Sequence, residues 1–407
     1  MNELKKHLKE SSLLSFSFLR WFILASISGT FVGIVISFFL KSLQYATVTR
    51  EDNPWLLYLL PLGGAFVSYL YAKHGKNSAK GNNLIIERVN NGEGKIPFRM
   101  APLVFLGTFI THLFGGSAGR EGTGVQIGAS ISSKIGEVLR LNGKDLKILI
   151  ISGISSGFGV VFGTPIAGTV FGLEVTTIGK MRYEAIIPCL ISSFIGNIIA
   201  NIFKVKHSHY NMGNALSGND VFLKVIVCAI LFGLTSKLFS ELTHILKGFF
   251  NEKIPNPILK SFIGGILIIL VVFILKTRIY LGLSLDLLND SFINPVFKGA
   301  FIIKLILTSL TLSVGFQGGE VTPLFVIGAT FGNLLASLIG LPIEFLAALG
   351  MIGVFCGATK TPLASFIMGV ELFGSSNISF LFITCVISYV FAGKSGIYKS
   401  QNIDILE

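Results

Sequence analysis

Apolar segments follow one another along the chain with only short polar interruptions between them. They cover residues 21–45, 55–72, 101–115, 125–140, 146–175, 184–204, 219–250, 257–281, 300–316, 322–340, 343–373 and 377–393. Many are shorter than the roughly 20 residues that a helix needs to cross a bilayer, or are interrupted by glycine and proline. Because transporters built from half-helices and re-entrant segments have this pattern, we expect an all-α polytopic membrane protein with broken helices.

Short motifs recur at about half the length of the chain, which predicts two structural repeats. Thr-Pro-x-Ala, followed by Gly-x-Glu, occurs at 164–174 and returns with identical spacing at 361–371. Gly-Arg-Glu-Gly-Thr at 119–123 is echoed by Gly-Gly-Glu-Val-Thr at 318–322, an echo that pairs Glu121 with Glu320. Repeats of this kind favour a substrate site between the two halves. The motifs alone do not decide whether the repeats are parallel or inverted.

The repeats lead to a simple division of the chain. We expect residues 1–20 to form a cytoplasmic amphipathic helix, because lysines precede the first apolar segment there. Residues 21–210 would then be the first transmembrane repeat and residues 211–407 the second. No soluble regulatory domain is expected.

Composition agrees with a membrane protein and excludes several other classes. The 407 residues are 51% hydrophobic and only 13% charged, whereas soluble domains carry about 25% charged residues. The net charge of +12 could indicate nucleic-acid binding. Its lysines and arginines gather before the first apolar segment and within 73–99, which is typical of a cytoplasmic face beside anionic lipid. We therefore expect membrane lipid as a partner and no nucleic acid.

Metal and cofactor sites are not expected from this sequence. All four cysteines lie in apolar runs without metal-ligand spacing, so they are interpreted as packing residues. His207 and His209 share a polar loop but have no third ligand nearby in the sequence.

The stretch 115–128 is the most informative part of the chain. Five glycines surround the adjacent Arg120 and Glu121, with apolar sequence on both sides. Charges at such a depth are costly unless they line a cavity or an ion path, and glycines let backbone N–H groups turn toward a ligand. We predict a broken helix whose positive end faces an anion, with Glu121 as a titratable gate at its opening. The alternative is an Arg120–Glu121 ion pair, although adjacent side chains point in different directions.

Other polar residues in apolar surroundings have two interpretations each. Glu320 is interpreted as a second protonatable group in the pathway, or as a capping carboxylate at a helix start. Glu174 and Glu371 recur at the same point of both repeats, which favours a structural role at a helix end. Lys304 and Lys360 receive no assigned role.

Two further segments carry weak signals when each is taken alone. Gly81, Asn82 and Asn83 precede an apolar helix and could offer amide donors to an anion, or could simply form a helix cap. Tyr398 near the C-terminus would by itself be interpreted as an interfacial anchor.

The sequence from Gly119 to Gly122, continued by Val-Gln-Ile-Gly at 125–128, resembles the CLC family of anion channels and proton-coupled antiporters. The resemblance covers nearly the whole chain and includes the turn at 318–323 and Tyr398. It implies a CLC-type fold, with two inverted-topology repeats and a pore in each subunit of a homodimer.

Departures from the usual family pattern point to one branch. Thr123 stands where other members have proline, and Val175 stands where many exchangers have an inner glutamate. Asn82 replaces a serine in the first anion motif, and Glu320 replaces an apolar residue. Together these departures resemble the bacterial fluoride/proton antiporters. The resemblance therefore implies a multi-pass protein of the bacterial cell membrane that exports fluoride in exchange for protons.

The resemblance also implies a role for each candidate residue. Glu121 would be the outer gate, Tyr398 would supply an inner-gate hydroxyl, and Glu320 with Thr322 would replace the missing inner glutamate. The other anion-binding positions implied by the motifs are Gly81, Asn82, Asn83, Gly119, Arg120, Gly122 and the backbone N–H of Val321. Phenylalanine ring edges could also face the anion, but the sequence does not say which rings.

Two rival functions remain open at this stage. A chloride channel or chloride/proton exchanger would share the fold but not the departures at Asn82 and Glu320. An intramembrane enzyme would need an acid–base pair such as Glu121 and Glu320, but no nucleophile or metal-ligand set accompanies them. We therefore expect a transporter and no enzymatic activity.

Overall fold

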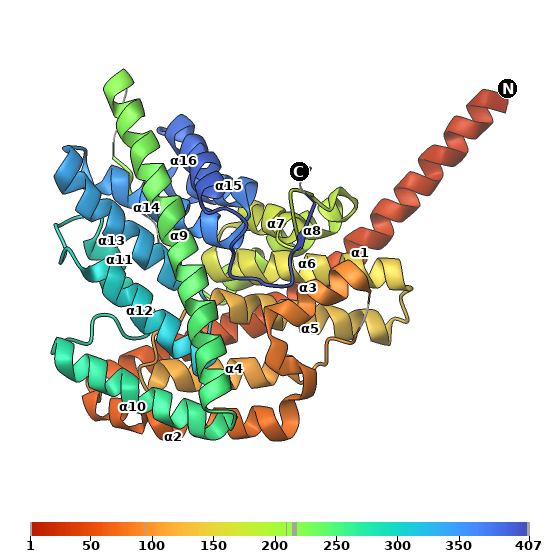
Figure 1. Cartoon of the computed structure of the whole chain (residues 1–407). Coiled ribbons are helices and arrows are strands. Elements are labelled where there is room, and N and C mark those ends of the chain that lie inside the picture. Colours follow the sequence, from red (N-terminus) through yellow and green to blue (C-terminus); the bar gives the residue numbers. More distant parts are fainter. Residues whose placement is uncertain (1, 93, 209, 214–217, 405–407) are drawn as a thin grey trace.

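A computed structural model describes residues 2–92, 94–208, 210–213 and 218–404, with side chains from residue 15 onward. Helices make up most of this part of the chain (Figure 1). They are α1 (Asn2–Asp52), α2 (Leu60–Leu70), α3 (Asn82–Asn91), α4 (Met100–Leu113), α5 (Glu121–Val138), α6 (Gly143–Phe162), α7 (Pro165–Glu174), α8 (Ile186–Ile202), α9 (Asn219–Lys253), α10 (Pro257–Leu275), α11 (Leu285–Asp290), α12 (Ala300–Ser313), α13 (Val321–Ile339), α14 (Ile343–Thr359), α15 (Pro362–Phe373) and α16 (Ile378–Phe391).

Shorter elements complete the architecture. They are the 3₁₀ helices η1 (Pro54–Leu59), η3 (Lys76–Lys80) and η4 (Tyr183–Ala185), the π-helix η2 (Tyr71–Gly75), and two strands, β1 (Thr177–Ile178) and β2 (Asn402–Ile403). The two strands pair in parallel, so the end of the chain is fastened to the segment that follows α7. The expected all-α class is confirmed, with this two-residue pairing as a small addition.

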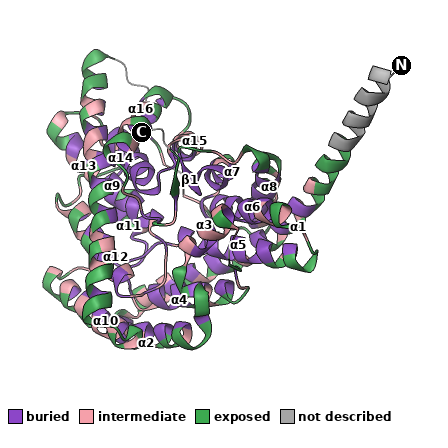
Figure 2. Cartoon of the chain, turned by 45° about the vertical axis from the view of Figure 1, so that its right-hand side comes forward, coloured by how far each residue is buried: buried purple, intermediate pink, exposed green. Residues whose placement is uncertain are grey.

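The helices have the lengths and surfaces of a multi-pass membrane protein. Within the described residues, seven helical stretches are long and apolar enough to cross a bilayer, while α4, α12, α14, α15 and α16 are apolar but shorter. Large apolar side chains remain exposed on outward faces, such as Phe273 at 77% and Ile198 at 52%. Figure 2 shows the exposed residues on the outside of the helices and the buried ones toward the middle of the molecule. These outward faces suit contact with lipid.

The expected separate helix over residues 1–20 is not present. The backbone of α1 runs without a break from Asn2 to Asp52, so the basic N-terminal segment and the first apolar segment share one helix. The sequence has neither glycine nor proline before Gly29, so nothing in its composition ends a helix there. The amphipathic character expected of residues 1–20 falls mostly on side chains outside the described ones.

Two of the long apolar segments are each divided into two helices. Residues 146–175 form most of α6 and all of α7, and residues 343–373 form α14 and α15. Gly163 and Lys360 adopt left-handed backbone conformations at the breaks, with φ of 74° and 61°. A proline then begins each following helix, where its fixed φ suits the first turn. The predicted breaking of helices by Gly and Pro is therefore confirmed.

The helix boundaries define the repeats more sharply than the motifs do. Helices α4, α5 and α6 begin at Met100, Glu121 and Gly143, and α12, α13 and α14 each begin 200 residues later. In this register Arg120 corresponds to Glu320, whereas Glu121 corresponds to Val321. The echo that paired Glu121 with Glu320 is therefore wrong by one residue.

Two reciprocal sets of hydrogen bonds join the repeats. Gly119 and Gly319 form an antiparallel bridge, in which each N–H donates to the other carbonyl at 2.6 and 2.8 Å. The Glu174 carboxylate, at the end of α7, accepts the N–H groups of Leu363 and Ala364 at 3.1 and 2.8 Å, in the first turn of α15.

Glu371 of the second repeat makes the hydrogen bonds that correspond to those of Glu174. The Glu371 carboxylate, in the last turn of α15, accepts the N–H groups of Ile166 and Ala167 at 3.0 and 2.7 Å, in the first turn of α7. The equivalent helices α7 and α15 therefore run antiparallel, as inverted-topology repeats require. Both glutamates lie at helix ends and hold backbone donors, in agreement with the structural role favoured by the sequence.

Replacing Glu174 with glutamine is expected to destabilise the protein by about 1–3 kcal/mol, because two charge-assisted hydrogen bonds to a helix start are weakened. The melting temperature of the purified protein measures this effect. Glu184→Gln is a matched control, since Glu184 is half exposed and lies 3.9 Å from Arg182 in a surface ion pair. Equal melting temperatures for the two variants, or loss of proton coupling in Glu174→Gln with unchanged stability, would contradict a structural role.

Candidate functional site

The starts of α5 and α13 meet at the Gly119–Gly319 bridge in the middle of the molecule. The first N–H groups of a helix lack partners within the helix and carry partial positive charge. Because two such helix starts converge on one place, the structure concentrates donors for an anion there. The predicted broken helix around 115–128 is present, with its break at residues 114–120.

Glu121 is fully buried and its carboxylate lies against the start of the opposite helix. Its Oε2 atom accepts the N–H of Thr322 at 3.0 Å and the N–H of Arg120 at 3.1 Å. The Thr322 hydroxyl donates to Oε1. The carboxylate therefore takes the place that a bound anion would take at the N-terminus of α13.

The alternative of a simple Arg120–Glu121 ion pair describes the site poorly. The shortest distance between the Arg120 guanidinium and the carboxylate is 4.0 Å, from Nε to Oε1. That Nε atom is buried and has no hydrogen-bond partner among the described residues. The N–H groups and the hydroxyl approach the carboxylate more closely than the guanidinium does.

Glycines allow this close approach. A Cβ atom on Gly119 would lie 2.7 Å from Oε2 of Glu121, and one on Gly319 would lie 2.6 Å from the N atom of Gly122. A side chain at either position would therefore displace the carboxylate or the start of α5. The Thr123 hydroxyl shares a hydrogen bond of 2.7 Å with the Thr108 hydroxyl on α4.

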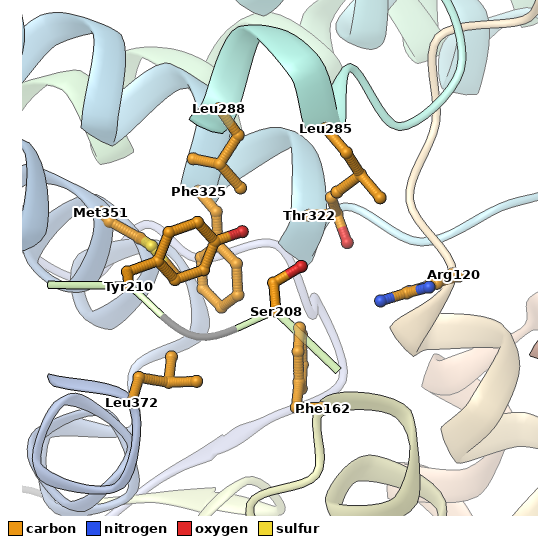
Figure 3. Close-up of a pocket in the computed structure, with 10 residues that line it drawn as sticks. All are labelled: Arg120, Phe162, Ser208, Tyr210, Leu285, Leu288, Thr322, Phe325, Met351 and Leu372. Carbon is orange, nitrogen blue, oxygen red and sulfur yellow. The ribbon is translucent and has the colours of Figure 1, made fainter. Parts of the chain in front are cut away.

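A small cavity lies beside the carboxylate. Its volume is about 30 Å³, enough for roughly one water-sized particle. Figure 3 shows the polar groups of Arg120, Thr322 and Ser208 turned toward this space. The rings of Phe162 and Phe325 line it, with their centroids 5.1 Å apart. These two rings could not be named from sequence, because they come from different repeats and meet only in the folded chain.

Asn82 lies at the start of α3 and approaches the start of α5. Its Nδ2 atom lies 3.0 Å from the position that a Cβ atom of Gly122 would take. Its Oδ1 atom is buried and has no partner among the described residues. Gly81 precedes it with φ of 58° and lies against Gln126, whose Oε1 atom is likewise buried and unpartnered within the described chain. The start of α3 therefore lies close to the start of α5, which meets the start of α13 at the bridge.

Glu320 and Arg120 occupy equivalent places in the two repeats, but their side chains have different neighbours. Arg120 borders the small cavity. The Glu320 Oε2 atom lies 3.6 Å from the Cβ position of Gly122, on the side of Asn82. Thr322 bonds to Glu121 rather than to Glu320. Of the two residues proposed as a coupling element, Thr322 therefore contacts the gate carboxylate directly.

Tyr398 is buried, and its hydroxyl lies within electrostatic range of the carboxylates of Glu320 and Glu121. Hydrogen bonds hold the segment around Tyr398 in place. Ser400 N–H donates to the Asn83 Oδ1 atom at 3.0 Å, and Ile397 N–H donates to a carbonyl of α14 at 2.9 Å. Asn83 thus holds the Tyr398 segment through its side chain, whereas the sequence grouped it with the anion-binding residues.

Lys304 and Lys360 are both buried and bind backbone carbonyls. Lys304 Nζ donates to the carbonyls of Tyr280 and Gly282 at 3.1 and 2.8 Å, and to the Ser284 hydroxyl at 2.9 Å. Lys360 Nζ donates to the Gly393 carbonyl. These contacts order the loop before α11 and the end of α16.

A metal centre finds no support in the described part of the chain. No group of three or more His, Cys, Asp or Glu side chains lies together there. The four cysteines are free and buried, in agreement with their interpretation as packing residues. Of the two loop histidines, His207 lies against Gly163, and His209 is outside the described residues.

Comparison with known proteins places this site in a family context. Residues 63–393 match the family described as "Voltage gated chloride channel". A chloride/fluoride channel protein of Pseudomonas syringae is 41% identical over 94% of this chain and 86% of its own length. A crystal structure of a CLC-type fluoride/proton antiporter superposes with a TM-score of 0.93 at 38% identity, covering 96% of this chain and 99% of that chain. An H⁺/Cl⁻ exchange transporter of Vibrio campbellii is 25% identical over 86% of this chain and 81% of its own length.

Proposed function

The chain belongs to the CLC family of voltage-gated chloride channels and related transporters, and we propose that it is a proton-coupled fluoride antiporter. In this proposal each subunit exchanges cytoplasmic fluoride for external protons through its own pore. It acts as a homodimer in the bacterial cell membrane. The protein is a transporter by its family, and no catalytic residue is assigned.

The position of the Glu121 carboxylate carries the proposal. The negatively charged carboxylate of Glu121, at the start of α5, accepts hydrogen bonds from the N–H and hydroxyl groups of Thr322 at the start of α13 and from the N–H of Arg120. When the carboxylate takes up a proton it loses its attraction for these donors, so an anion can replace it. The same group then carries the proton, which links anion movement to proton movement in one side chain.

Fluoride as the anion is supported by the chemistry of the site and by the relatives. Fluoride is strongly hydrated, so a site must replace its water with close donors. The start of α13 and the Thr322 hydroxyl supply such donors beside a cavity of about 30 Å³, and the Asn82 amide lies next to Gly122 at the start of α5. The 41% identical relative is named a chloride/fluoride channel protein, and the closely superposing structure is a fluoride/proton antiporter.

On the inner side of the bridge, Glu320 and Tyr398 provide the second half of the pathway. Val175 at the end of α7 has no ionisable group, and its carbonyl accepts a hydrogen bond from the Gln401 amide at 2.8 Å. The Glu320 carboxylate lies beside Gly122 and within electrostatic range of Tyr398. We assign the inner proton step to Glu320, with Thr322 acting through its bond to Glu121.

Anion efflux from liposomes that contain the purified protein tests the choice of anion. Fluoride-selective and chloride-selective electrodes follow the two anions from matched vesicles. We expect fluoride efflux to exceed chloride efflux by at least about tenfold, since a group of tight donors favours the smaller ion. Equal or faster chloride efflux would favour the rival chloride/proton exchanger or chloride channel of the same fold.

Replacing Asn82 with serine is expected to raise chloride flux relative to fluoride flux by about tenfold. Serine has one donor on a shorter side chain, so the space beside Gly122 widens and one amide donor is lost. The ratio of the two initial efflux rates measures the change. Asn91→Ser, at the exposed end of α3, serves as the control. An unchanged ratio in Asn82→Ser would remove Asn82 from the selectivity of the pore.

A further inference from the structure

A wide groove opens on the surface where α4 begins and α5 ends. Its volume is about 630 Å³, and four cationic side chains line it: Lys76 from η3, Lys95 and Arg99 from the segment before α4, and Lys134 from α5. All four are exposed. The carboxylate in the lining is that of Glu137, whose Oε2 atom lies 3.7 Å from Lys134 Nζ. The groove therefore carries a clear excess of positive charge.

The second repeat contains a groove in a similar position, and no cationic side chain is part of its lining. That groove has a volume of about 550 Å³ and is lined by the equivalent segments before α12 and after α10, including Thr277, Val296 and Phe297. Asp290 is its charged lining residue. Because the repeats are inverted, the two grooves open toward opposite faces of the molecule. The fold thus produces a groove in each repeat, and only the first groove has cationic side chains in its lining.

The basic groove lies at the border between apolar and polar surface. Lys76 falls near the end of a stretch long and apolar enough to cross a bilayer, and Arg99 directly precedes the apolar helix α4. Phe98 in its lining is 53% exposed, and Val138 and Leu139, which directly follow the lining residue Glu137, are 68% and 47% exposed. Cations next to exposed apolar side chains match a molecule with a charged head and a hydrocarbon body.

We propose that this groove binds the phosphate head group of an anionic phospholipid in the cytoplasmic leaflet. Arg99 is already fixed in place, because its NH1 group donates to the His74 carbonyl at 3.2 Å, and its other N–H groups can donate to phosphate oxygens. Lys76, Lys95 and Lys134 surround the same space. The lipid chains lie along Phe98, Val138 and Leu139. This site is separate from the anion pathway and does not depend on which anion is transported.

Native mass spectrometry of the full chain in detergent tests the proposal. Phosphatidylglycerol and phosphatidylcholine with identical acyl chains are titrated into the protein. We expect phosphatidylglycerol to bind at least about 25-fold more tightly, because each basic side chain near a phosphate contributes about fivefold. The double variant Lys95→Gln/Lys134→Gln is expected to lower the affinity for phosphatidylglycerol by about 25-fold and to leave that for phosphatidylcholine unchanged.

A charge-matched variant on the other face provides the control. Lys276→Gln/Lys298→Gln removes two exposed lysines beside the second groove and is expected to keep full phosphatidylglycerol binding. Millimolar inorganic phosphate is expected not to displace the lipid. Equal binding of the two lipids, an unaffected Lys95→Gln/Lys134→Gln variant, or full displacement by inorganic phosphate would each overturn the proposal. The first two results would leave the lysines as orientation signals alone.

Discussion

Replacing Glu121 with glutamine is expected to abolish proton movement during fluoride transport, with coupled proton flux falling by at least about 100-fold. Glutamine keeps the shape of the side chain and can still accept hydrogen bonds from the Thr322 and Arg120 N–H groups. Its amide does not bind or release a proton near neutral pH. It also competes less strongly for the positive start of α13. Simultaneous fluoride and pH recordings from proteoliposomes measure both fluxes.

A surface carboxylate provides the control for this variant. Glu241 lies on α9 with its side chain 48% exposed and its Oε1 atom 3.8 Å from Lys237 Nζ. Glu241→Gln is expected to retain the wild-type ratio of protons to fluoride. If Glu121→Gln also retained that ratio, Glu121 would not be the group that carries the proton.

Replacing Glu320 with glutamine or alanine is expected to slow coupled turnover by about tenfold or more, since one group that carries a proton is lost. Its carboxylate lies near Gly122 and within electrostatic range of Tyr398. The alternative role, a cap at the start of α13, would lower the melting temperature instead. Initial fluoride and proton fluxes, together with melting temperatures of the same preparations, separate the two roles.

Glu174→Gln is the matched control for Glu320, because Glu174 is also a buried carboxylate beside a helix start. It is expected to lose stability while its ratio of protons to fluoride is preserved. Full turnover and coupling in Glu320→Gln would refute the proton role assigned to Glu320.

The sequence predicts those parts of the site whose signals are local. Glycines around a charged pair in an apolar stretch mark the break before Glu121, because flexible backbone and a costly charge are both visible within a few residues. The breaks before Pro165 and Pro362 are predictable for the same reason. Repetition of the Gly-x-Glu motif also identified Glu174 and Glu371 as structural, and the structure places both at helix starts of the opposite repeat.

Other features depend on contacts between distant residues and could not be predicted. The prediction that Glu121 and Glu320 are equivalent was wrong because it relied on the shared Gly-x-Glu motif. The helix boundaries define a different register, and they are known only from the fold. The hydrogen bond between Asn83 and Ser400 joins residues 317 positions apart, so the sequence carries no sign of it. Phe162 and Phe325 meet across the repeats, and sequence alone contains no sign of their contact. The continuous start of α1 was predictable from the lack of glycine and proline before Gly29, but the charge pattern suggested a boundary there.

The most direct test of proton-coupled fluoride exchange is transport driven by a proton gradient. Vesicles contain the purified protein and equal fluoride inside and outside, with potassium and valinomycin holding the membrane potential near zero. Acidifying the outside is expected to drive fluoride out of the vesicles against its own rising gradient, and Glu121→Gln is expected to stop this movement. Fluoride that stays at equal concentration on both sides, despite rapid downhill fluoride flux in a parallel assay, would show a channel and contradict the antiporter account.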